Sequence, residues 1–186
     1  MQNKFFKTAE AFRTWLNKNG RQETEIWVGF YKKDSGKTGM SLKEAIDEAL
    51  CAGWVDGLKG SLDDISYRIR FTPRKPKSVW SKINIGHAER LIREGRMTPA
   101  GQAQIEAAKA DGRWERAYEG AKNAEPPEDF LKALNKNKKA KAFFKTLNRA
   151  NTFAIYFRIT NAKKPETRQR WIERIIAMLE NGETFH

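Results

Sequence analysis

The chain has 186 residues and a formal net charge of +13, because 36 lysines and arginines outnumber 23 aspartates and glutamates. This is the length of one domain, or of one domain with an appendage, and it buries enough surface to fold without disulfides. Hydrophobic residues make up 39% of the chain, which excludes a wholly disordered protein. No apolar run reaches the roughly 20 residues of a membrane-spanning helix, and the N-terminus lacks the apolar core of a secretory signal. We therefore expect a cytoplasmic protein with no membrane span.

Few residues suit metal or covalent chemistry. Cys51 is the single cysteine, and with only His87 and His186 beside it the sequence contains no zinc-binding set. We interpret Cys51 as a packed small hydrophobic residue. The segment 35–39 ends like a phosphate-binding loop, but its spacing from the preceding glycine does not fit that motif. We expect no cofactor and no metal.

Helical and strand patterns alternate at the start of the chain. Residues 8–18 place apolar side chains at helical spacing after Thr8, which we expect to cap this helix. Residues 25–33 alternate as a strand with aromatic side chains on both faces. Ser41 and Glu44 have the spacing of a capping box and predict a helix to about residue 52.

Two further strands are expected at 54–59 and 66–74. The second has an apolar face and a polar face, in which Tyr67, Ile69 and Phe71 alternate with Arg68, Arg70 and Thr72. These patterns predict a small sheet of at least three strands, two of them in an antiparallel hairpin, packed with two helices.

The second half of the chain has helical patterns. Segments 81–93 and 98–109 each combine a capping residue with apolar positions at helical spacing. Two adjacent prolines mark a linker at 123–128, and three or four short helices are expected after it. The segment 152–161 fits either a buried helix or a strand, and we favour a helix.

Together these elements predict an α+β fold in two parts. Residues 1–122 form an α+β N-terminal domain in which helices pack against a small β-sheet. Residues 123–186 form a helical C-terminal domain.

Positive charge is concentrated in two segments. Between residues 68 and 96 nine basic residues meet two acids, and between residues 132 and 149 seven basic residues meet none. The first segment also contains tryptophan, and an indole beside arginines can form a cation-π surface. We predict an anion-binding patch around the strand 66–74, walled by Trp54 and Trp80. Its predicted ligand-binding residues are Lys33, Asp56, Tyr67, Arg70, Arg74, Trp80 and Lys82.

Three other interpretations of this region stay open. In the simplest, Asp56 pairs with Arg68 or Arg70 across neighbouring strands and only fixes their register. In the second, the basic segments bind nucleic acid, because cations neutralise phosphates and aromatic rings stack on bases. In the third, the protein is an enzyme that uses Asp56 or Glu48 as a general base near Arg70. We assign no catalytic residue, and a non-enzymatic binding protein with an unknown anionic ligand is our first interpretation.

Several long motifs resemble the bacterial YdeI/OmpD-associated family, also described as bacteriocin-protection proteins. They occur in order along most of the chain, at 49–57, 61–84, 89–101, 108–118 and 162–183. Ala52 departs from the pattern, since the family is expected to have an aromatic residue before the glycine.

The resemblance implies an α+β N-terminal part and a helical C-terminal part. It also implies a role in protection against bacteriocins or cationic antimicrobial peptides, and an association with an outer-membrane porin. It brings no catalytic residues to this chain. Because we find no export signal, we expect a cytoplasmic role in stress or envelope response and no direct contact with a porin.

Overall fold

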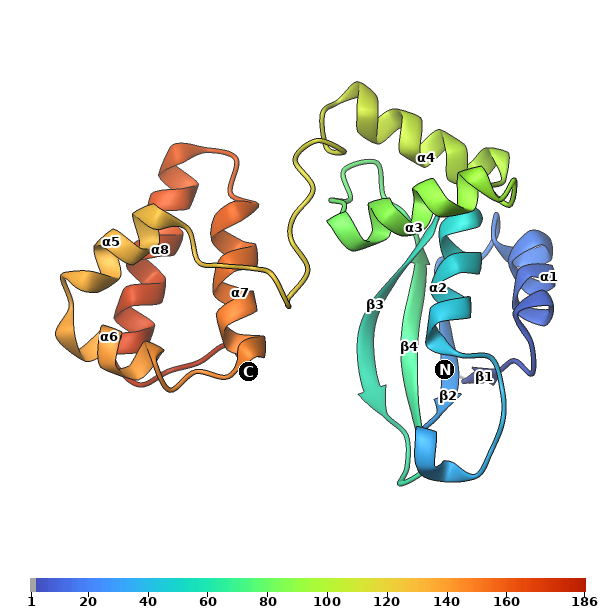
Figure 1. Ribbon diagram of the computed structural model, residues 1–186, viewed down its shortest axis with the longest axis horizontal. Helices are drawn as coiled ribbons and strands as arrows, with labels where there is room; N and C mark the ends of the chain where they lie inside the picture. Colours follow the sequence, from blue (N-terminus) through green and yellow to red (C-terminus); the bar gives the residue numbers. More distant parts are fainter. Residues whose placement is uncertain (1–2) are drawn as a thin grey trace. The chain divides into compact units, whose positions relative to one another are not determined.

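The computed structural model describes residues 3–186 and divides the chain into two compact units (Figure 1). The first unit extends to Ala117 and the second begins at Tyr118. Strands occur in the first unit only, among the described residues, and helices occur in both. The predicted α+β fold class is therefore confirmed.

The first unit is built on a four-stranded sheet. Its strands are β1 (Lys4–Phe5), β2 (Ile26–Tyr31), β3 (Trp54–Ser61) and β4 (Ser66–Pro73). They lie in the order β1-β2-β4-β3, with β1 parallel to β2 and both other pairings antiparallel. The predicted hairpin is thus formed by β3 and β4. Its register shifts at an irregularity between Asp56 and Lys59.

Two helices cover one face of this sheet. They are α1 (Ala9–Asn19) and α2 (Leu42–Cys51), and a short 3-10 helix, η1 (Lys33–Ser35), follows β2. Both expected caps are present: the Thr8 hydroxyl accepts from the Ala11 amide, and Ser41 and Glu44 form a capping box. The buried core between helices and sheet contains Phe12, Leu16, Ile26, Val28, Phe30, Ala45, Ala49, Trp54, Ile69 and Phe71.

A second buried cluster lies on the other side of α2. There α3 (Lys82–Arg93) and α4 (Pro99–Ala110) pack against the C-terminal end of α2. The cluster consists of Leu50, Cys51, Trp80, Ala88, Leu91, Ile105 and Ala108. Gly101 permits this approach, because a Cβ there would lie 2.4 Å from the carbonyl oxygen of Cys51.

The second unit is helical. It contains α5 (Glu128–Asn135), α6 (Lys138–Phe144), α7 (Arg149–Thr160) and α8 (Pro165–Glu180). The ambiguous segment 152–161 is a helix, as we favoured. The core consists of Phe130, Leu134, Ala140, Ile155, Ile159, Ile172, Ile175 and Leu179. Arg168 ties α8 to α5, since its Nε and Nη2 both donate to the carboxylate of Asp129.

The helices of the described chain are too short or too polar to cross a lipid bilayer.

Candidate anion-binding surfaces

The residues predicted to form one patch lie in different places. Lys33 is exposed in η1, beyond the end of β2, and Lys82 is exposed at the first turn of α3. Tyr67 packs against the helix-covered core of the first unit, whereas its strand neighbour Arg70 points to the opposite face of the sheet.

The register also separates Asp56 from the arginines. Asp56 lies opposite Phe71, so its side chain is on the helix-covered side, and the expected pairing with Arg70 or Arg68 is wrong. The physical reason is the alternation of side chains along β4. Arg70 instead has an ion pair with Glu25, in which Nη1 lies 3.7 Å from Oε2.

Arg74 and Trp80 do come together, but inside the protein. The guanidinium carbon of Arg74 lies 3.7 Å from the centre of the Trp80 ring, and Arg74 and Trp80 are only 6% and 2% exposed. The Trp80 ring also packs at 5.0 Å against that of Trp114. Trp54 belongs to the other core cluster. The two indoles expected to wall one pocket are therefore buried in two separate cores. Each is a large apolar group, and each is covered by its own core cluster.

The open face of the sheet gathers a different set of aromatic and basic side chains. Trp27 lies opposite Arg70 on β4, and Gly29 lies opposite Arg68. The guanidinium carbon of Arg68 stacks 4.4 Å from the centre of the Trp27 ring. We call this surface the Trp27 face and define it by Phe5, Trp27, Tyr31, Arg68 and Arg70.

The Trp27 face continues to the edge strand. The ring of Phe5 stacks on Tyr31 with centroids 5.1 Å apart, and it fills the space that a Cβ on Gly29 would occupy. The ammonium of Lys37 lies 5.5 Å from the Tyr31 ring centre. Phe5 is 44% exposed, and the other four members of the face are half-buried.

The arginines of the Trp27 face keep unused hydrogen-bond donors. The Nε atoms of Arg68 and Arg70 are covered and make no hydrogen bond within residues 3–186. Arg68 donates a hydrogen bond from Nη1 to the Oδ1 of Asn3 at 3.3 Å. A guanidinium has five N–H donors, so the Nη groups of both arginines remain to bind an anion, whereas the covered Nε atoms do not reach one.

The two buried acidic side chains of α2 are held by basic side chains outside that helix. The buried Glu48 carboxylate accepts from Arg13 and from Arg96, each at 2.7 Å. Asp47 accepts from His87 Nδ1 at 2.8 Å and from Arg90 Nη2 at 2.6 Å. Glu48 therefore lies among structural ion pairs and not beside Arg70, where the general-base interpretation placed it.

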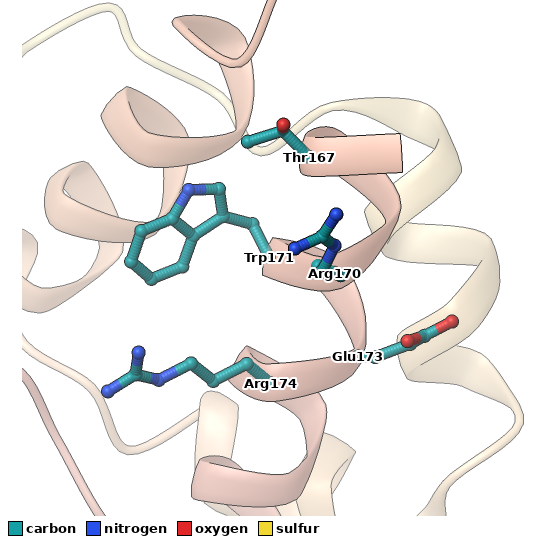
Figure 2. Close-up of a pocket in the computed structure, with 5 residues that line it drawn as sticks. All are labelled: Thr167, Arg170, Trp171, Glu173 and Arg174. Atoms are coloured by element: carbon teal, nitrogen blue, oxygen red, sulfur yellow. The ribbon is translucent and has the colours of Figure 1, made fainter. Parts of the chain in front are cut away.

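A second basic and aromatic surface lies on α8, and our sequence analysis missed it (Figure 2). A hollow of about 500 Å³ is lined by Thr167, Arg170, Trp171, Glu173 and Arg174. Thr167, Trp171 and Arg174 are spaced by four and three residues, which places them on one side of a helix. That spacing is a signal that could have been read from the sequence.

The structure thus combines an α+β unit, whose sheet has an open basic and aromatic face, with a helical unit that has a basic aromatic helix. Residues 4–104 match the family model of a domain of unknown function, DUF8412, and the chain belongs to this family. Residues 123–182 match the family described as Bacteriocin-protection, YdeI or OmpD-Associated. The resemblance found in the motifs is confirmed by this match, which covers the helical unit and not most of the chain. Comparisons with curated proteins and with solved structures found no match.

Proposed function

We propose that this protein is a non-enzymatic binding protein that takes an anionic ligand on the Trp27 face. The observation that carries the proposal is the stack of Arg68 on Trp27, 4.4 Å apart, beside Arg70 on the same face of β4. Stacking fixes a planar guanidinium and leaves its edge free to donate, which suits phosphate or carboxylate groups.

The net charge of the protein argues for the same class of ligand. With a formal charge of +13, the chain attracts anions and repels cationic peptides. Protection against bacteriocins or antimicrobial peptides, suggested by the match of residues 123–182, would then act through an anionic ligand and not through capture of the peptide. We propose a cytoplasmic role of this kind, without direct contact with a porin.

A thermal-shift screen tests the binding step. Purified protein is screened with phosphate, pyrophosphate, polyphosphate and heparin, and compared with the double variant Arg68→Gln/Arg70→Gln. An anion that binds only the folded state stabilises it by RT ln(1 + L/Kd), where L is the free anion concentration, so the melting temperature rises with that concentration. The control, Lys43→Gln/Arg93→Gln, removes the same charge from two exposed positions on α2 and α3. We expect the control to keep the shift and the double variant to lose it, and equal shifts in all three would contradict the proposal.

A survival assay tests the link with protection. Bacteria that lack the protein are complemented with wild type, with Arg68→Gln/Arg70→Gln or with the control, and exposed to a cationic antimicrobial peptide. We expect survival to be restored by wild type and control only. Full protection by the double variant would show that protection does not need the Trp27 face.

Single-stranded nucleic acid is the second candidate ligand, favoured by the Phe5–Tyr31 stack that extends the face with aromatic rings. Aromatic side chains on an open sheet beside arginines bind unpaired bases without reading a sequence. Fluorescence anisotropy with a labelled single-stranded 12-mer is compared with a duplex of the same length. Tighter binding of the single strand, weakening as salt rises, supports this candidate. Equal affinity for both, or no salt dependence, would exclude it.

A further inference from the structure

The surface of α8 has the dimensions and the chemistry of a small-molecule site. Its hollow of about 500 Å³ lies within the usual range for ligand pockets. The side chains of Trp171 and Arg174 extend to the same side of α8, with Thr167 one turn away (Figure 2). One aromatic ring, one hydroxyl and one guanidinium thus face a common space.

A second helix supplies another cation to the same ring. Arg158 on α7 lies 5.9 Å from the Trp171 ring centre, and Arg174 lies 5.5 Å from it. Arg158 is held in place, because its Nη1 donates to the carbonyl of Ala154 at 3.0 Å and its guanidinium stacks 3.8 Å from the Phe185 ring centre. The guanidinium of Arg158 is therefore fixed beside the indole before a ligand arrives.

The positive charge of this surface is not neutralised. Arg168 on the same helix pairs with Asp129, whereas Arg170 and Arg174 are exposed and have no ion pair within the described part of the chain. Glu173 is the acid that lines the hollow, and it extends to the other side of α8 in Figure 2. The amide of Gln169 donates to its carboxylate at 2.8 Å.

We propose that this surface binds a nucleoside phosphate. The base stacks on Trp171, and the phosphates accept hydrogen bonds from Arg170 and Arg174. An indole recognises a flat ring, and exposed guanidiniums recognise phosphate in bidentate geometry, so a ligand that contains both groups uses the whole site. This site lies in the unit that matches the bacteriocin-protection family, whereas the residues of the Trp27 face belong to the first unit.

Isothermal titration calorimetry on the full chain tests this proposal with ADP, adenosine and pyrophosphate as separate probes. We expect ADP to bind at least tenfold more tightly than either adenosine or pyrophosphate, because each of these lacks one of the two recognised groups. In Arg68→Gln/Arg70→Gln, where the Trp27 face contributes no anion binding, pyrophosphate that binds as tightly as ADP would overturn the stacking of the base. Absence of heat with millimolar ADP would overturn the site.

Variants locate the binding. Arg170→Gln/Arg174→Gln changes exposed residues and is expected to weaken ADP binding at least tenfold, and Trp171→Phe is expected to weaken it less. The control Lys138→Gln/Lys139→Gln removes equal charge from exposed positions on α6 and should bind like wild type. Arg68→Gln/Arg70→Gln should keep the ADP binding that Arg170→Gln/Arg174→Gln removes, which separates this site from the proposed function. Unchanged affinity in Arg170→Gln/Arg174→Gln would contradict the assignment, and a thermal melt of each variant verifies that it is folded.

Discussion

Arg13 and Glu48 form a bidentate ion pair between α1 and α2, in which Nε and Nη2 of the arginine each lie 2.7 Å from a carboxylate oxygen. The Nη2 of Arg96, which follows α3, donates to the same carboxylate at 2.7 Å. Glu48 is only 1% exposed, whereas both arginines are partly exposed. One buried acid therefore joins three segments of the first unit.

Loss of both arginines should destabilise the first unit more than loss of the acid. Arg13→Gln/Arg96→Gln leaves a buried carboxylate without its cations, which costs about 3 kcal/mol. Glu48→Gln leaves two guanidiniums that can turn towards water, and should cost about 1–2 kcal/mol. Urea unfolding at pH 7 measures both, with Arg93→Gln as an exposed control. A larger loss for Glu48→Gln than for the double variant would contradict this account of the cluster.

Stability on the acid side should depend on Asp47. Burial raises the pKa of this carboxyl, but hydrogen bonds from His87 and Arg90 outweigh that effect, so the pKa lies below its usual value of 3.8. Because the folded pKa is the lower one, the unfolded chain binds the proton first as the pH falls. The contribution of Asp47 is therefore complete above about pH 5 and is lost through pH 3.8 and below.

The test of this linkage is urea unfolding of wild type and Asp47→Asn between pH 3 and pH 6. We expect the difference in free energy of unfolding between the two proteins to shrink as the pH falls below about 4. A difference that stays constant over the whole range would show that Asp47 has the same pKa in both states.

Cys51 should be inert in the folded protein. Burial raises the pKa of its thiol to about 11, and the negative charge of Glu48 adds to this effect. The thiolate is the reactive species, so little of it exists at neutral pH. Labelling with a disulfide reagent at pH 8 should proceed only as fast as the first unit opens, and rapidly in 6 M urea. Equally rapid labelling without urea would show that the thiol is accessible.

Gly29 should be required for the packing of the Phe5 ring on the sheet. A Cβ at position 29 would lie 2.4 Å from the Phe5 ring, so Gly29→Ala should displace that ring and cost about 1–3 kcal/mol. The same substitution in a Phe5→Ala background should cost little, because the clash is gone. Thermal unfolding of the four proteins completes the cycle. If Gly29→Ala costs as much in both backgrounds, the contact with Phe5 is not the cause.

The sequence predicted local structure better than it predicted contacts between residues far apart in the chain. The caps at Thr8 and Ser41 and the alternation of β4 depend on residues a few positions apart, and all were confirmed. The pair of Arg13 with Glu48 spans 35 positions and leaves no local pattern. The pairing expected for Asp56 was wrong for the same reason. The partner of Asp56 on β4 depends on the register shift between Asp56 and Lys59, which the sequence does not reveal.

Burial was the other property that the sequence did not reveal. Arg74 and Trp80 have the composition of an exposed binding site, yet they stack in the interior of the first unit. Trp27 and Arg68 lie 41 positions apart, and only the pairing of β2 with β4 brings them into contact. Arg170, Trp171 and Arg174 lie within one turn of helix and could have been recognised by spacing alone.

A heteronuclear NMR titration with polyphosphate tests the central claim most directly, because it reports where the anion binds. We predict saturable shifts of the Trp27 indole N–H and of the backbone amides of Arg68 and Arg70, and their loss in Arg68→Gln/Arg70→Gln. Shifts confined to other parts of the chain, with β2 and β4 unchanged at saturation, would contradict binding on the Trp27 face.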